Sequence, residues 1–254
     1  MANDRRPVSI GTYFHDTEDP QSPADVAVIM PTVLRPTLEA ALESVFAQKD
    51  AGRIQLLVGV DKILGDPDRL KGPLSRKPDH VSAIALTLPF STSVRHGGVH
   101  GATDGGSLRA VLSFIANSRY VAYLDDDNVW EPDHLASLLE AIQDKYWAHS
   151  LRMLVDEKSG EELGVDRWDA VGVGRGRFAD QGGMVDPSCL MIDKVKASRP
   201  LGRWTEGPGV HSDRSVFRAI QDLPHGRVDR ATVRYSVRRT NILLKFMETG
   251  QEFD

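Results

Sequence analysis

Apolar residues along the first half of the chain come in short continuous runs separated by longer amphipathic stretches. Such a short run is typical of a strand buried on both faces of a sheet. The amphipathic stretches repeat their apolar residues every three to four positions, which predicts helices. The predicted strands are residues 26–30, 54–60, 81–88 and 120–124, and the predicted helices are 36–46, 107–116 and one that begins at Pro132.

Strands that alternate with helices predict an α/β fold with a mainly parallel sheet flanked by helices. Residues 1–24 are polar and rich in turn formers, so we expect a loosely held lead-in segment. Residues 62–80 contain Gly, Pro and Lys throughout and predict a loop.

The second half of the chain is less regular. A hairpin is predicted around residues 158–160. No internal repeat or low-complexity linker divides the chain, so one continuous domain is expected. The remaining predicted elements are strands at 150–155, 171–174, 185–192 and 231–237 and a short helix at 213–220.

Composition narrows the class of protein without identifying it. The 254 residues are 41% hydrophobic and 26% charged, with a net charge of −5, which gives no indication of general nucleic-acid binding. The single cysteine, Cys189, lies in an apolar run and is expected to be an inert core residue. It allows no intramolecular disulfide, which favours a reducing compartment.

Location and surface contacts are predicted from local features. Residues 1–6 lack the apolar segment of a signal peptide, and no stretch reaches the ~20 apolar residues of a membrane span, so a cytoplasmic protein is expected. Residues 227–239 carry five arginines. A solvated face explains them most simply, and the alternative is contact with phosphates, an anionic acceptor or the inner face of a membrane.

The most informative feature is the run Asp125-Asp126-Asp127 directly after the strand at 120–124. Carboxylates this close repel one another unless a cation neutralises them. Carboxylate oxygens at the carboxyl edge of a strand suit Mg²⁺ or Mn²⁺, which shares them with the phosphates of a substrate. The alternative is a solvated acidic turn that caps the next helix.

Five segments of the chain have a characteristic sequence and order: 26–32 (VAVIMPT), 58–61 (VGVD), 123–135 (YLDDDNVWEPDHL), 185–191 (VDPSCLM) and 209–214 (GVHSDR). In these segments the chain resembles the family 2 glycosyltransferases of the GT-A fold, and around residues 126–135 it is particularly similar to the bacterial spore-coat polysaccharide glycosyltransferase. The resemblance extends over most of residues 25–222.

This resemblance implies a single domain in which residues 25–128 bind a nucleoside-diphosphate sugar and residues 129–254 bind a glycan or lipid-linked acceptor. Asp61 would bind the base, usually uracil in this family, and Pro31, Thr32 and Arg35 would line the same site. Asp127 would hold the metal on the diphosphate, and Asp126 would contact the ribose or the metal. The share of Asp125 stays open.

The implied base is Asp213. An inverting transfer needs a carboxylate that takes the proton of the acceptor hydroxyl, while a metal neutralises the departing diphosphate. An ordinary helix-capping role is the alternative for Asp213. Some relatives carry a further metal-ligating histidine, for which His225 is the candidate, although a surface histidine is the simpler interpretation. His211 would contact donor or acceptor, and Trp204 would stack on an acceptor sugar.

The sequence departs from the family where an Ala-Arg-Asn type segment commonly precedes the carboxylate strand. Residues 101–108 read GATDGGSL instead, and Asp104 is the candidate to replace the missing contacts.

Three other functions share parts of this pattern. A Mg²⁺-dependent phosphatase would use Asp125 as nucleophile and Asp127 as acid, but its nucleophile strand normally comes first. A sugar nucleotidyltransferase would need a Gly-rich segment after the first strand, where residues 31–35 read PTVLR. A nucleotide-sugar-binding subunit without catalysis would keep the fold and lose the chemistry.

Overall fold

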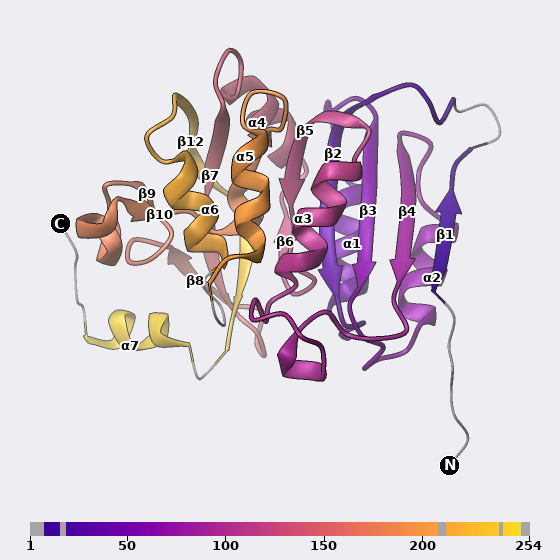
Figure 1. Cartoon of the computed structure of the whole chain (residues 1–254). Helices are drawn as coiled ribbons and strands as arrows, with labels where there is room; N and C mark the ends of the chain where they lie inside the picture. Colours follow the sequence, from indigo (N-terminus) through magenta and orange to yellow (C-terminus); the bar gives the residue numbers. More distant parts are fainter. Residues whose placement is uncertain (1–7, 16–18, 208–211, 239–240, 250–254) are drawn as a thin grey trace.

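A ten-stranded mixed sheet forms the centre of the molecule, with helices on both faces (Figure 1). The computed structural model describes residues 8–15, 19–207, 212–238 and 241–249. The strand order is β1-β4-β3-β2-β5-β11-β7-β12-β6, and β8 pairs with β7. The strands are β1 (Ser9–Tyr13), β2 (Ala24–Thr32), β3 (Ile54–Val60), β4 (Val81–Thr87), β5 (Ser118–Tyr123), β6 (Val129–Trp130), β7 (Trp147–Asp156), β8 (Glu162–Val165), β11 (Leu190–Asp193) and β12 (His225–Val237).

The predicted α/β fold is confirmed, but only the first half of the sheet is all parallel. There β4, β3, β2 and β5 run in one direction. In the second half β11 is antiparallel to both β5 and β7, and β12 is parallel to β7 and antiparallel to β6. The short antiparallel pair β9 (Gly172–Val173) and β10 (Gly183–Met184) lies outside the main sheet.

Helices cover both faces of the first half. α1 (Leu38–Phe46) and α2 (Asp68–Ser75) lie on one face, and α3 (Gly106–Ile115) lies on the other (Figure 1). Gly59 allows the close approach of α3, because a Cβ atom there would lie 3.0 Å from Leu112. The other helices are α4 (His134–Ala141), α5 (Ser198–Leu201), α6 (Ser212–Ile220) and α7 (Ile242–Thr249), and the 3-10 turns are η1 (Val94–His96), η2 (Gly176–Gln181), η3 (Pro187–Cys189) and η4 (Gly202–Thr205).

The core lies between the sheet and these helices. All seven residues of β3 are buried, as expected for a strand with helices on both faces. Cys189 is fully buried, in agreement with its predicted core position. Trp130 is also buried, and its indole Nε1 donates to the carbonyl oxygen of Ser188 at 2.8 Å.

The structure corrects two predicted irregular segments. The lead-in contains β1, which pairs antiparallel with β4 at the edge of the sheet. The predicted loop at 62–80 contains α2, whose buried Leu70 and Leu74 lie one turn apart. The predicted strand at 185–192 is shorter than expected because η3 interrupts it before β11 begins at Leu190. The hairpin around 158–160 is confirmed, since β7 and β8 pair antiparallel across it.

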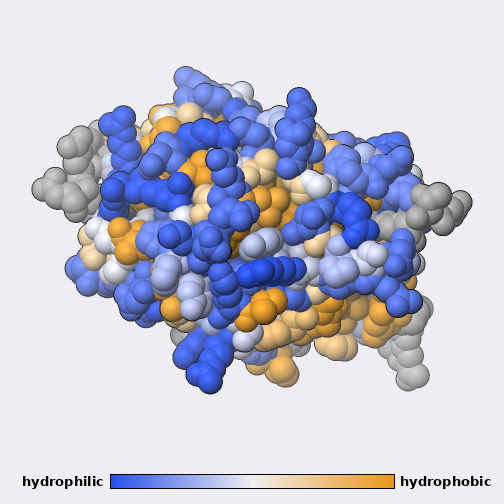
Figure 2. All heavy atoms as spheres, turned by 90° about the horizontal axis from the view of Figure 1, so that it is seen from above, coloured by the Kyte–Doolittle hydropathy of each residue, from blue (hydrophilic) through white to orange (hydrophobic). Residues whose placement is uncertain are grey.

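The end of the molecule opposite the carboxyl ends of the parallel strands is mostly hydrophilic, with hydrophobic surface gathered along its lower edge (Figure 2). Apolar side chains that are at least half exposed include Val111, Phe114 and Ile115 of α3.

None of the helices in the described ranges is both long and apolar enough to cross a membrane.

Candidate functional site

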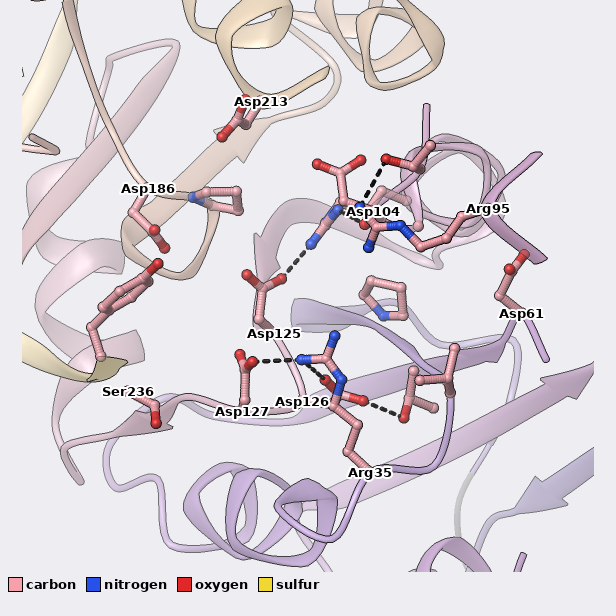
Figure 3. A pocket seen from close by; sticks show the side chains of 18 of the residues that line it. Arg35, Asp61, Arg95, Asp104, Asp125, Asp126, Asp127, Asp186, Asp213 and Ser236 are labelled. Atoms are coloured by element: carbon pink, nitrogen blue, oxygen red, sulfur yellow. Dashed lines mark hydrogen bonds and ion pairs between the residues drawn. The ribbon is translucent and has the colours of Figure 1, made fainter. Parts of the chain in front are cut away.

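A pocket of about 460 Å³ lies at the carboxyl ends of β2, β3 and β5, the edge at which open α/β sheets bind ligands. Residues of both halves of the chain line it (Figure 3). The structure brings together at this pocket nine of the residues that the sequence singled out: Pro31, Thr32, Arg35, Asp61, Asp104, Asp125, Asp126, Asp127 and Asp213.

The loop between β2 and α1 takes a strained backbone conformation at the pocket. Leu34 has a φ of 64°, in the left-handed region that a bulky side chain rarely adopts. Its amide donates to the hydroxyl of Thr32 at 2.8 Å, and that hydroxyl donates to Asp126 Oδ2 at 2.6 Å. The strained turn therefore fixes the Asp126 carboxylate to the end of β2.

Each of the three consecutive carboxylates has an arginine beside it. Asp125 pairs with Arg109. Asp126 lies 3.5 Å from Arg35, which also contacts Asp127 at 2.5 Å. Asp127 accepts a second bond from Arg238 at 2.8 Å. Arginine from three separate segments thus offsets the repulsion that the sequence predicts. Figure 3 shows Arg35 between Asp126 and Asp127.

The arginines do not compensate fully for burial. The pKa of Asp127 is raised to about 6, first by desolvation and then by the charge of Asp125, although Arg35 opposes the shift. Desolvation also raises the pKa of Asp126. A further cation near these oxygens would therefore stabilise their charged forms.

A divalent cation fits this donor set when a substrate supplies further ligands. Among the residues that the structure describes, no group of three or more His, Cys, Asp or Glu side chains is arranged to hold a metal ion. Mg²⁺ commonly takes one or two protein carboxylates and completes its shell with phosphate oxygens and water. Asp127, with its raised pKa and its place in the pocket wall, is suited to that role.

Asp61 stands at the end of β3 and organises the next loop. Its Oδ1 accepts from the amide of Thr92 at 2.8 Å and from the hydroxyl of Thr92 at 2.6 Å, and its Oδ2 accepts from Ser91. Only 5% of Asp61 is exposed, so it presents a small part of the carboxylate to a base in the pocket.

Asp213 lies in the first turn of α6, across the pocket from Asp127 (Figure 3). Its carboxylate accepts from the amide of Arg214 at 2.6 Å, and it forms no ion pair with the described residues. Its pKa is raised to about 7, first by desolvation and also by the charges of Asp104 and Asp186, although the amide of Arg214 and the charge of Arg109 oppose the shift. A carboxylate with a pKa near neutrality and a free oxygen is suited to accept a proton.

Asp104 joins the glycine-rich segment to α6. Its Oδ1 accepts a hydrogen bond of 3.1 Å from the hydroxyl of Ser212, the residue that precedes Asp213 in the chain. The neighbouring Gly105 has a φ of 80°, and a Cβ atom there would lie 2.6 Å from Pro31. Glycine therefore lets this segment approach the end of β2.

Sequence reasoning gave no site role to nine charged or polar residues that line the pocket: Arg95, His96, Thr103, Arg109, Asp186, Tyr235, Ser236, Arg238 and Asn241. Arg109 is buried and donates to the carbonyl oxygen of Asp104 and to Asp125, sixteen residues later in the chain. The sequence does contain a signal for this residue, because an arginine on the buried face of a helix needs an acidic or polar partner inside the protein. Asp186 comes from the loop before β11, and Tyr235 and Arg238 come from β12 and its end. Asp186 lies in the segment 185–191 that carries the resemblance and Arg238 in the arginine-rich run, but neither pattern predicts the place of its residue in the pocket.

Two predicted site residues lie elsewhere, and a third is outside the described ranges. Trp204 is fully buried and packs against Tyr123 at a ring-centroid distance of 4.7 Å, so it is a core residue and offers no face to a sugar. His225 begins β12 and stacks on Trp147, at the opposite end of the strand from Tyr235. The structure does not bring it to Asp127. His211 lies outside the described residues.

The arginine-rich segment at 227–239 is neutralised within the protein. Its described arginines pair with acidic side chains, and Arg239 lies outside the described residues. This pairing argues against the alternative that the segment forms a basic surface for contact with a membrane. The pairs are Arg227 with Asp229, Arg230 with Asp133, Arg234 with Glu131 and Glu162, and Arg238 with Asp127 and Glu157.

Comparison with known proteins points to one fold. No protein-family model matches the chain. One curated relative, the succinoglycan biosynthesis protein ExoW of Rhizobium meliloti (strain 1021), is 30% identical over 115 residues, which are 44% of this chain and 32% of ExoW. The matched region is therefore about a third of that relative.

Solved structures of S. aureus TarS superpose on most of the chain. TarS 1-349 gives a TM-score of 0.62 at 14% identity, covering 84% of this chain and 60% of TarS 1-349. The structure of the same TarS segment in complex with UDP-GlcNAc gives a TM-score of 0.62 at 14% identity. The match covers 87% of this chain and 60% of the TarS segment.

These comparisons do not test the similarity to the spore-coat enzyme, which stays a prediction. They agree with the mixed sheet and its flanking helices. The chain has the GT-A fold, and its comparisons support the resemblance to the family 2 glycosyltransferases.

Proposed function

We propose that this protein is a metal-dependent, inverting glycosyltransferase that moves a sugar from a nucleoside-diphosphate donor to a hydroxyl of a glycan or lipid-linked acceptor. The observation that carries the proposal is one pocket with Asp127 on one wall and Asp213 on the other. The fold supports it, and so do the UDP-GlcNAc complex of TarS and the polysaccharide role in the name of ExoW.

The donor would lie along the ends of β2, β3 and β5. Asp61 and Thr32 would flank the nucleoside, and the diphosphate would lie near Asp127, Arg35 and Arg109. Mn²⁺ or Mg²⁺ shared by Asp127 and the diphosphate would neutralise the leaving group. The three arginines of this region now pair with the carboxylates. With a donor bound they would also form charge-assisted hydrogen bonds with the phosphates.

The chemical step would begin at Asp213. Its carboxylate takes the proton of the acceptor hydroxyl, the hydroxyl oxygen bonds to the anomeric carbon, and the bond to the diphosphate oxygen breaks with its electron pair. The nucleoside diphosphate leaves on the opposite side of the ring, so the configuration inverts. With a pKa of about 7, Asp213 gains competence as a base as the pH rises through neutrality.

The test separates the two carboxylates. In calorimetry with UDP and Mn²⁺, Asp213→Asn is expected to bind within about twofold of the wild type and to lose about 10²–10⁴-fold in the release of UDP from UDP-GlcNAc. Asp127→Asn is expected to lose the part of UDP binding that requires Mn²⁺. Asp222→Asn, an exposed aspartate outside the pocket, serves as the matched control.

Weakened UDP binding with unchanged turnover in Asp213→Asn would remove this residue from the base role. Mn²⁺-dependent UDP binding that survives in Asp127→Asn would place the metal elsewhere. UDP binding without any release of UDP from UDP-GlcNAc, with or without an acceptor, would favour the non-catalytic subunit.

A further inference from the structure

The wall of the pocket beyond the three consecutive carboxylates is formed by Asp186 and Tyr235, neither of which the sequence analysis singled out. Asp186 lies in the loop before η3, and Tyr235 lies near the end of β12. In Figure 3 Asp186 faces the space between Asp125 and Asp213. This space lies between the expected diphosphate position and the proposed base, where a transferred sugar would sit.

A buried arginine behind the wall holds both residues in place. Arg152 of β7 is 1% exposed and does not line the pocket. Its Nη1 donates to Asp186 Oδ2 at 2.5 Å, and its guanidinium carbon lies 3.9 Å from the centre of the Tyr235 ring. The wall therefore has a fixed geometry before any ligand enters.

The Arg152 guanidinium is fully committed to the protein. Its Nε donates to Asp166 at 2.9 Å and its Nη2 to Asp169 at 3.1 Å, in addition to the bond with Asp186. Arg152 therefore acts as a positioning residue, and it cannot offer a cation to a substrate.

Asp186 keeps capacity to bind a ligand. Besides Arg152, its carboxylate accepts from the amide of Ser188 at 2.8 Å, which leaves one lone pair on each oxygen. The hydroxyl of Tyr235 makes no hydrogen bond with the residues that the structure describes. Together they offer two acceptor positions and one hydroxyl to a ring with hydrogen-bond donors.

The side chains around this space are mostly negative. Arg95, for which the described residues provide no acidic partner, lines the pocket on the side of Asp104, away from Asp186 (Figure 3). Asp104, Asp125, Asp186 and Asp213 surround it. Arg109 is the cation whose charge acts on three of them, and it is already bonded to Asp125 and to the carbonyl oxygen of Asp104. A carboxylate on the sugar would meet like charges at short range with no uncommitted cation on this wall.

We propose that Asp186 and Tyr235 form the subsite for the transferred sugar and select an uncharged sugar with free hydroxyls against a uronic acid. This assignment rests on the proposed function and adds the class of sugar to it. Asp186 accepts hydrogen bonds from the sugar hydroxyls, and its charge rejects a carboxylate on the same ring.

The test compares two donors that differ only in that carboxylate. Calorimetry measures the dissociation constants of UDP, UDP-glucose and UDP-glucuronic acid in the presence of Mn²⁺. The wild type is expected to bind UDP-glucose at least tenfold more tightly than UDP-glucuronic acid. Asp186→Asn is expected to reduce this ratio to about threefold or less and to leave UDP binding within twofold. Tyr235→Phe should weaken UDP-glucose alone, and Asp222→Asn should change nothing.

A ratio near one in the wild type, or a ratio that Asp186→Asn leaves unchanged, would overturn the sugar assignment while UDP binding upholds the proposed donor site. Failure of all three uridine ligands to bind, with or without Mn²⁺, would overturn both. Circular dichroism of Asp186→Asn distinguishes loss of the fold from loss of selectivity, and Tyr235→Phe, which keeps the ring on Arg152, provides the second reading.

Discussion

Burial of the Asp213 carboxylate costs free energy that the amide of Arg214 and the charge of Arg109 offset only in part, and this cost is measurable without knowing the substrate. Its pKa of about 7 in the folded protein lies above the ordinary value of 3.8. The folded state therefore holds the proton more tightly than the unfolded state. The resulting stabilisation is complete below about pH 4 and is lost as the pH rises through 7.

Asp213→Asn should therefore stabilise the protein more at pH 8 than at pH 5. Asparagine has a similar shape and no charge to desolvate. The gain in free energy of unfolding should grow by about 2 kcal/mol between these pH values, since one pKa unit corresponds to about 1.4 kcal/mol and the pocket leaves the group partly solvated. Urea titrations at both pH values measure it. A gain that is the same at pH 5 and pH 8 would show that the raised pKa is absent.

Removal of Arg152 should have the opposite effect on stability, because its positive charge compensates carboxylates that are already buried. Arg152→Met should lower the free energy of unfolding by about 3–5 kcal/mol, since Asp166 and Asp186 would keep their burial and lose their partner. The matched control is Arg230→Met, which breaks an exposed pair with Asp133 and should cost less than about 1 kcal/mol. Denaturant unfolding compares the two, and equal losses would contradict the structural role of Arg152.

The sequence predicts the pocket residues that follow strands, and it fails for those that reach the pocket across the sheet. Asp61 and Asp125 are marked by the apolar runs before them. Asp186 has no such mark, and the sequence marks Arg238 only as part of an arginine-rich run, because long-range pairing of β11 and β12 brings both to the pocket. Trp204 shows the converse error, since an aromatic residue between polar neighbours is still free to turn into the core.

Among the elements, the buried strands and amphipathic helices are close to their predicted bounds, and the failures have physical causes. Gly72 and Pro73 lie inside α2, and both are unfavourable in a helix interior, so local propensity hides it. β1 has no fully buried residue, and its pairing partner β4 is some seventy residues away. β1 is a strand because it pairs with β4 in the folded protein, and no local sequence pattern predicts that pairing.

The start of α3 gives a prediction at the level of an element. A Cβ atom on Gly106 would lie 2.1 Å from the carbonyl oxygen of Trp204, so Gly106→Ala should push α3 away from η4 and cost about 1–3 kcal/mol. Because α3 carries Arg109, binding of UDP should weaken as well.

The control for this change lies in the neighbouring turn. Gly202 has helical backbone angles, and a Cβ atom there would have nothing within 4 Å. Gly202→Ala should therefore be neutral or stabilise the protein by up to about 1 kcal/mol. Thermal unfolding and calorimetry with UDP compare the two variants, and a Gly106→Ala protein as stable as Gly202→Ala would refute the close contact.

On the scale of the whole molecule, the pocket has two walls with different chemistry. The parallel strands of the first half bring three consecutive carboxylates and their arginines to one side. The strands of the second half bring Asp186 and Tyr235 to the other, and β11 joins the two halves by pairing with β5 and β7. A rigid connection of this kind fixes the distance between donor and acceptor groups without a hinge.

The position of β12 has a consequence for how the pocket assembles. β12 lies between β7 and β6, although both precede it in the chain. The strands before residue 225 already bring Asp125, Asp126 and Asp127 to the end of β5, but Tyr235 and Arg238 come from β12 and its end. Until β12 inserts, these carboxylates lack one of their arginines and β7 keeps an open edge. Closure of this part of the sheet and assembly of the pocket are thus one event.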